Sequence, residues 1–187
     1  MLQPGSAAAV VGDEGVHEAL AERGVLIVPA ASRPAAVVVG RTLALDYDEL
    51  AEAASAVRDG ARLVATNTDA TFPTGHGLLP GAGALVAFVA TASGCEPEVA
   101  GKPHRAMASL VRQRYGGVDW VVGDRADTDG AFARQVGAHF GLVLSGVTQR
   151  SQLPVDPRPD IVAGDLAELV AGYMGAGRCG PAGTPQA

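Results

Sequence analysis

A pair of carboxylates follows a short apolar segment in the second half of the chain. The sequence Trp-Val-Val-Gly-Asp, residues 120–124, ends in Asp124, and Asp129 comes soon after it. Carboxylate oxygens are the ligands that Mg²⁺ prefers, and one or two suffice because the ion keeps several waters. Asp124 and Asp129 could therefore hold Mg²⁺. The spacing equally allows Asp124 to be a turn residue and Asp129 to be a helix cap.

A lysine with possible chemistry lies further towards the N-terminus, in the sequence Val-Ala-Gly-Lys-Pro, residues 99–103. Lys102 follows a glycine at the end of a predicted strand, and Pro103 is suited to the first turn of a helix. A lysine at such a position could stabilise the charge of a phosphoryl group. A surface lysine in a connecting loop would have the same local sequence, so this alternative stays open.

Polar residues also follow the predicted strand 61–66. Asn67 and Asp69 open a segment, residues 67–83, that is rich in Gly and Pro. These residues are typical of turns, so we expect a loop of defined shape. The loop could contact a ligand through Asn67 and Asp69, or it could be only a connection.

The elements that position these residues are predicted from alternating apolar and amphipathic segments. This alternation is typical of an α/β fold with a parallel sheet, in which ligands bind outside the carboxyl ends of the strands. Asp124 lies at such an end. The predicted strands are 7–12, 25–29, 35–40, 61–66, 96–100, 119–122, 141–146 and 160–164, and the predicted helices are 14–24, 46–60, 82–93, one after Pro103, 129–137 and 165–173.

Composition excludes several classes of protein. The 187 residues are 48% hydrophobic and carry a formal net charge of -6, so no basic surface is expected to bind nucleic acid. No apolar segment approaches the roughly 20 residues that a membrane span requires. Cys95 and Cys179 are far apart in sequence, which favours a reduced, cytoplasmic setting over a disulfide framework. A Rossmann-type nucleotide binder is disfavoured because no G-x-G-x-x-G follows the first strand.

Four segments in this order resemble the haloacid-dehalogenase-like hydrolases of subclass IIA. The segments are ATNTDATFPT with GLLPGAGAL (65–85), GKPHRAM (101–107), VVGDRADTDGA (121–131) and LVLSGVT (142–148). Residues 8–24 and 35–53 are similar to the first half of the family's cap domain. The resemblance implies an incomplete parallel Rossmann-like core with an α/β cap domain of the C2 type. It places a linker at 1–6, the cap at 7–98 and the C-terminal half of the core at 99–174. The Gly- and Pro-rich tail 175–187 is predicted to be disordered.

The resemblance also implies an activity, the Mg²⁺-dependent hydrolysis of a small phosphorylated metabolite through an aspartyl-phosphate. It makes Lys102 the lysine that steadies the phosphoryl group, Asp124 the Mg²⁺ ligand and Asp129 its supporting carboxylate. Asn67 and Asp69 match the cap loop that covers the leaving group. Members of the family often associate, so the resemblance also implies a homodimer.

One motif of the family is missing from this sequence. The family's nucleophile belongs to a D-x-D-G-T/V motif that precedes the cap, and the D-x-D here, Asp46-Tyr47-Asp48, reads instead as a helix N-cap and first turn. We therefore expect an N-terminally truncated chain without its nucleophile, inactive alone. The alternative is a non-catalytic remnant or binding module of the same fold. Because the nucleophile's strand normally lies beside strand 119–122, we also expect that strand to have an unpaired apolar edge.

Overall fold

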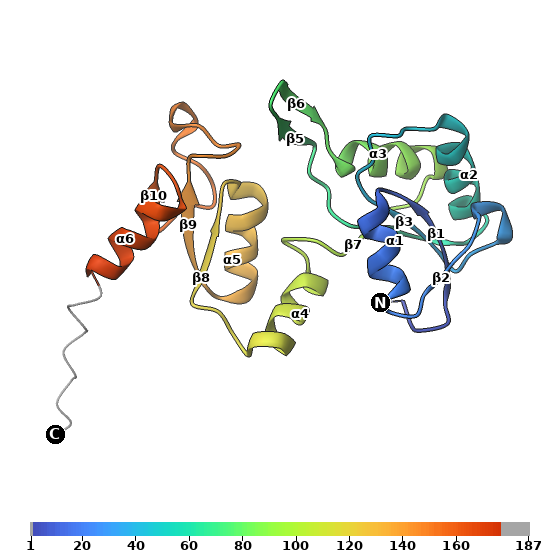
Figure 1. Cartoon of the computed structure of the whole chain (residues 1–187), viewed down its shortest axis with the longest axis horizontal. Coiled ribbons are helices and arrows are strands. Elements are labelled where there is room, and N and C mark those ends of the chain that lie inside the picture. The colour runs from blue at the N-terminus through green and yellow to red at the C-terminus, as the bar shows by residue number, and fades with distance from the viewer. Residues whose placement is uncertain (1, 177–187) are drawn as a thin grey trace. The chain divides into compact units, whose positions relative to one another are not determined.

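The computed structural model describes residues 2–176, and the chain forms two compact units (Figure 1). Unit 1 extends to Ser109 and unit 2 begins at Leu110. The division falls within helix α4 (Arg105–Tyr115). The predicted boundary between cap and core at 98/99 stays a prediction, and the predicted disorder of the tail concerns residues that lie mostly outside the described ones.

Unit 1 contains a five-stranded parallel sheet with the strand order β2-β1-β3-β4-β7. The helices of the unit connect these strands, as the alternating sequence pattern predicts. The strands are β1 (Ala7–Val11), β2 (Leu26–Ile27), β3 (Ala36–Val39), β4 (Arg62–Ala65) and β7 (Glu98–Val99), and the helices are α1 (Glu14–Ala21), the 3₁₀ turn η1 (Ala30–Ser32), α2 (Tyr47–Arg58) and α3 (Ala82–Ser93).

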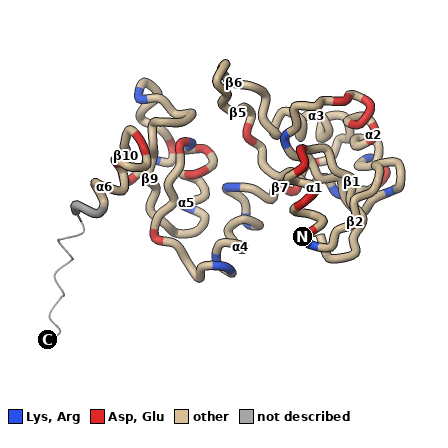
Figure 2. Tube along the Cα trace, in the orientation of Figure 1, with Lys and Arg blue, Asp and Glu red and all other residues tan. Residues whose placement is uncertain are grey.

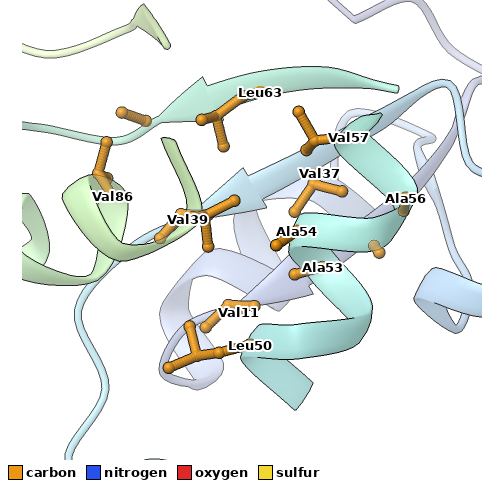
Figure 3. Packing of buried hydrophobic residues seen from close by; sticks show 13 residues of the cluster. Val11, Val37, Val39, Leu50, Ala53, Ala54, Ala56, Val57, Leu63 and Val86 are labelled. Carbon is orange, nitrogen blue, oxygen red and sulfur yellow. The ribbon is translucent and has the colours of Figure 1, made fainter. Parts of the chain in front are cut away.

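The core of unit 1 follows from the two-residue period of its strands. Val11, Val37, Val39 and Leu63 alternate along their strands and lie on one face of the sheet, where helices α2 and α3 cover them (Figure 3). The intervening residues, among them Val38, pack on the opposite face against side chains from α1. Apolar residues at every position of β1 and β3 are thus buried on both faces, which is typical of a parallel sheet.

Helix α2 begins where the sequence predicts. The side chain of Asp46 accepts a hydrogen bond of 2.8 Å from the backbone N–H of Asp48, which satisfies one of the free donors at the helix start. The N-cap interpretation of the D-x-D sequence is therefore confirmed.

The segment 67–83, predicted to be a loop of defined shape, contains two strands that the sequence analysis did not predict. Residues of this segment form an antiparallel hairpin of β5 (Thr71–Thr74) and β6 (Gly77–Pro80). The side-chain hydroxyl of Thr74 donates a 2.7 Å hydrogen bond to the carbonyl of Gly77, which has a φ of +118°. Pro73 and Pro80 made the segment look irregular, but a two-stranded ribbon leaves one side of each strand unpaired and so tolerates a missing N–H.

Unit 2 contains a three-stranded parallel sheet with the order β10-β9-β8. Phe140 and Leu142 of β9 lie in a core with Ala133 of α5, and Val143 on the other face lies in a core with Leu169 of α6. The strands are β8 (Trp120–Gly123), β9 (His139–Val143) and β10 (Ile161–Ala163), and the helices are α5 (Ala131–Val136), the 3₁₀ turn η3 (Arg150–Gln152) and α6 (Leu166–Ala176).

Strand β8 lies at the edge of this sheet. Among the described residues it pairs with β9 alone, and its Val122 is 36% exposed. The expected unpaired apolar edge is therefore confirmed. The parallel sheets of both units likewise confirm the predicted α/β class.

Helix α4 begins later than the sequence suggested. Pro103 was expected to start it, but residues 101–104 form a turn in which the N–H of His104 donates to the carbonyl of Gly101 at 3.0 Å. The first helical residue is Arg105. Across the described part of the chain, none of the helices combines the length and the apolar character needed to cross a bilayer.

Candidate functional site

Asp124 follows β8 directly and is held by the loop after the neighbouring strand β9. The N–H of Val147 donates to Asp124 Oδ2 at 2.7 Å, and the N–H of Thr148 donates to the Asp124 carbonyl at 3.2 Å. These contacts arise because the carboxyl ends of parallel strands meet at one edge of the sheet. The carboxylate is thus oriented through one oxygen, and Oδ1 accepts no hydrogen bond from any described residue.

Asp129 lies in a π-helical turn, η2 (Ala126–Gly130), which connects β8 to α5. Its side chain is almost fully buried, with 3% exposed, and its Oδ2 accepts the N–H of Arg125 at 3.1 Å. The N-cap of α5 is Gly130, so Asp129 does not cap that helix. Its carboxylate instead contacts the main chain beside Asp124, and the structure therefore brings the two predicted metal residues to one strand end.

Two glycines lie against these two carboxylates. A Cβ atom built on Gly123 would lie 2.0 Å from Asp129 Oδ2, and one built on Gly146 would lie 2.0 Å from Asp124 Oδ2. Neither position has a positive φ. The carboxylates therefore occupy space that any other residue at 123 or 146 would fill.

The donor set at this strand end suits a hard divalent cation. Asp124 presents a carboxylate oxygen without a hydrogen bond, and Asp129 lies beside it in a buried position. No group of three or more His, Cys, Asp or Glu side chains that could hold a metal occurs among the described residues. This count fits Mg²⁺, which is commonly held by one or two carboxylates while waters and phosphate oxygens fill its other positions.

Arg125 forms an ion pair within this turn. Its guanidinium donates to the carboxylate of Asp127, with Nη2 3.1 Å from Oδ2. Figure 2 shows acidic residues gathered on this connection between β8 and α5. Arg125 and Thr148 also line an open hollow of about 320 Å³ beside the loop that holds Asp124.

In unit 1, the predicted residues Asn67 and Asp69 belong to a tight turn after β4. Asn67 Oδ1 accepts the N–H of Asp69 at 3.1 Å, and the Asp69 carbonyl accepts the N–H of Gly83 at 3.0 Å. The turn is therefore tied to the first turn of α3. Both side chains are partly exposed, so both are accessible to a ligand.

Lys102 is exposed and lies in the turn between β7 and α4. A Cβ atom on its neighbour Gly101 would lie 2.5 Å from the carbonyl oxygen of Thr66 and 3.2 Å from Asn67 Cβ. The main chain before Lys102 thus packs against the start of the turn that carries Asn67. Lys102 belongs to unit 1 and Asp124 to unit 2, so their meeting at one phosphate stays a prediction.

Sequence reasoning did not find the role of the loop after β9. Gly146 and the N–H of Val147 contact Asp124, yet neither carries a chemical group that a motif search recognises. The available signal was the glycine in LSG, immediately after a predicted strand. A glycine in that setting indicates a close approach by another part of the chain.

Comparison with known proteins identifies the family of this chain. Residues 99–169 match the family model described as HAD-hydrolase-like. The p-nitrophenyl phosphatase from Archaeoglobus fulgidus is 31% identical, with a TM-score of 0.79 over 89% of this chain and 67% of that one. The chain belongs to the haloacid-dehalogenase-like hydrolases, subclass IIA.

Other members of the family match over most of this chain but over a smaller part of their own. The D-glycerol 3-phosphate phosphatase of Mycobacterium tuberculosis is 41% identical over 90% of this chain and 49% of its own length. A crystal structure of the glycerol phosphate phosphatase from that organism, in complex with magnesium, has a TM-score of 0.80 and covers 90% and 53% of the two chains. The present haloacid-dehalogenase-like chain thus spans about half the length of this relative.

Proposed function

We propose that this chain is part of a phosphatase that hydrolyses a small phosphorylated metabolite with the help of Mg²⁺. The observation that carries the proposal is the pair of carboxylates at the end of β8, one buried and one oriented by a backbone N–H. Relatives named as phosphatases of glycerol 3-phosphate and dihydroxyacetone phosphate support the substrate class.

Each predicted site residue has a role in this proposal. Asp124 would hold Mg²⁺, and Asp129 would support it from its buried position. When bound, the ion supplies positive charge that stabilises the oxygens of the transferring phosphoryl group. Lys102 would place its ammonium group against the same phosphoryl oxygens. Asn67 and Asp69 would contact the leaving group from the turn after β4.

The attacking carboxylate is not assigned to any residue of this sequence. Asp46 and Asp48 are committed to the start of α2, because the Asp46 side chain accepts the N–H of Asp48. We propose that the aspartate of a D-x-D-G-T/V segment from outside these 187 residues attacks the phosphorus. It would form an aspartyl-phosphate that water then hydrolyses. The exposed edge of β8 favours such a segment, because an added strand would pair with its free backbone groups.

Hydrolysis of p-nitrophenyl phosphate tests this proposal. The 187-residue chain is assayed with and without Mg²⁺, alone and together with a segment from a relative that carries the D-x-D-G-T/V motif. We expect turnover only when both the ion and the segment are present, and we expect its loss in Asp124→Ala and in Lys102→Ala. Glycerol 3-phosphate then serves as the first natural substrate to try.

The second candidate function is a non-catalytic remnant or binding module of the same fold. It predicts no turnover with the added segment, although a phosphorylated metabolite could still bind. Turnover that requires both Mg²⁺ and Asp124 would exclude it. The observation that favours this second candidate is the absence of the D-x-D-G-T/V motif from this sequence.

We also propose that the chain forms a homodimer and that it acts in the cytoplasm. Unit 1 exposes large apolar side chains that association could cover, among them Leu43 at 67%, Tyr47 at 70% and Leu78 at 60% exposure. Cys95 is a free thiol, as in a reduced compartment. Sedimentation of the purified chain measures the association state, and a monomer at micromolar concentration would contradict the dimer.

A further inference from the structure

The loop after β9 holds the candidate metal ligand without contributing a side chain to it. Gly146 lies against the whole side chain of Asp124: a Cβ atom at position 146 would lie 2.0 Å from Oδ2, 2.5 Å from Cγ and 2.6 Å from Cβ. Real Cβ atoms essentially never approach another heavy atom within 3.0 Å. An alanine at 146 and the observed position of Asp124 therefore exclude each other.

Neither a positive φ nor burial requires glycine at position 146. Its φ is not positive, so an L-residue can adopt the backbone conformation. The position is also exposed, so a methyl group there meets no buried core. In the described part of unit 2, the three nearest atoms to a Cβ at 146 all belong to Asp124. The absence of a side chain at 146 thus serves the carboxylate.

The neighbouring residue completes the contact. The N–H of Val147 donates to Asp124 Oδ2 at 2.7 Å, so the loop offers a donor beside the space that Gly146 leaves open. The orientation of Oδ1, which accepts no hydrogen bond from the described residues, depends on where Oδ2 is held. A displaced carboxylate would lose the Val147 N–H and turn Oδ1 away from its present direction.

We propose that Gly146 is a positioning residue for the metal ligand Asp124: it acts by leaving room for the carboxylate beside the Val147 N–H. This inference deepens the proposed function, because it assumes that Asp124 binds the divalent ion. It assigns a role to a residue that has no functional group of its own. A methyl group at 146 would displace the Asp124 carboxylate by rotation of its side chain, and the Cβ atom of Asp124, 2.6 Å away, could move only with the main chain.

Mn²⁺ binding is the first test, with the ion alone as the probe and electron paramagnetic resonance as the readout of the free ion. We expect Gly146→Ala to weaken Mn²⁺ binding about tenfold or more, the range typical of changes in the groups that orient a metal ligand. Asp124→Ala should weaken it at least as much. Gly117→Ala is the matched control, because Gly117 is exposed, has no positive φ and would place its Cβ in open space. It should bind Mn²⁺ as the unchanged chain does.

A double-mutant cycle on urea unfolding is the second test, and it does not depend on a metal. Any change in unfolding midpoint that Gly146→Ala causes should disappear in an Asp124→Gly background, because the whole clashing side chain, including its Cβ atom, is gone. A change that persists in that background would overturn the proposal, since Gly146 would then serve the fold. Unchanged Mn²⁺ binding by Gly146→Ala, together with loss in Asp124→Ala, would overturn it as well.

The two tests separate this inference from the proposed function. If Asp124→Ala binds Mn²⁺ as well as the unchanged chain does, Asp124 is not the metal ligand and the proposed site fails. The unfolding cycle then still decides whether Gly146 makes room for that carboxylate. A folded Gly146→Ala variant is recognised by its far-ultraviolet circular dichroism, so a loss of binding is not confused with a loss of structure.

Discussion

The carboxyl ends of β4 and β8 are built alike but differ in what their glycines contact. After β4, Cβ atoms at Gly81, Gly83 and Gly101 would lie 2.2 to 2.5 Å from main-chain carbonyl oxygens of residues 66–69. After β8, Cβ atoms at Gly123 and Gly146 would lie 2.0 Å from side-chain carboxylates. Both regions need glycine for a close approach, but one approach is to the backbone and the other is to a candidate metal ligand.

This difference separates stability from function. A carbonyl oxygen cannot move without its peptide unit, so crowding it disturbs the turn and the helix tied to it. A carboxylate can rotate away from a crowding methyl group, whereas its Cβ atom, 2.6 Å away at both sites, moves only with the main chain, so crowding an aspartate changes the site as well as straining the fold. Burial limits this rotation: Asp129 is only 3% exposed, so its side chain has little room to rotate.

Gly83→Ala gives the largest expected effect. The added methyl group would lie 2.4 Å from the Thr68 carbonyl oxygen, and we expect a loss of about 3 kcal/mol in the free energy of unfolding of unit 1. Urea denaturation followed by circular dichroism measures it.

Gly15→Ala is the matched control for this change. Gly15 and Gly83 are both the second residue of a helix in unit 1, and a Cβ at Gly15 meets nothing within 4 Å. Since alanine is the better helix former by about 1 kcal/mol, Gly15→Ala should leave stability unchanged or raise it. Equal effects of the two substitutions would contradict the contact at Gly83.

Gly123→Ala should have an intermediate effect. The methyl group would lie 2.0 Å from Oδ2 and 2.6 Å from Cβ of the buried Asp129, so we expect unit 2 to lose about 2 kcal/mol of stability. In an Asp129→Gly background the added loss should be smaller, because the whole crowded side chain is absent. A full loss in that background would show that β8 itself, and not Asp129, requires the glycine.

Asp160→Asn should have the smallest effect and should spare the metal site. Asp160 lies before β10, and the backbone N–H of Phe140, with help from His139, holds the pKa of its carboxyl below the ordinary value. A lowered pKa contributes stability above the ordinary Asp pKa, and this contribution is lost as the pH falls through the lowered value. Because the side chain is 49% exposed, we expect less than about 1 kcal/mol.

The pH dependence of unfolding measures this effect. The difference in stability between the unchanged chain and Asp160→Asn should be present at neutral pH and should shrink as the pH falls below about 4. Mn²⁺ binding should not change, because Asp160 contacts neither Asp124 nor Asp129 among the described hydrogen bonds. A change in Mn²⁺ binding would show that the metal site depends on residues of unit 2 away from the end of β8.

Much of the fold could be predicted from the sequence because its signals are local. The continuous apolar segments of β1 and β3 and the Asp46 cap act over a few neighbouring residues, and the structure confirms them. The hairpin of β5 and β6 was missed because its prolines hide the strand pattern. The start of α4 was misplaced because a turn that includes Pro103 precedes the helix.

The candidate site divides in the same way. The sequence by itself determined the identities and order of Asn67, Asp69, Lys102, Asp124 and Asp129, because each lies shortly after a strand or at the start of a helix that a local pattern predicts. Only the tertiary structure decided how the carboxylates are held. The loop at 146–148 meets Asp124 because β8 and β9 pair side by side, and a missing side chain contributes to a site only through the three-dimensional contact that it permits.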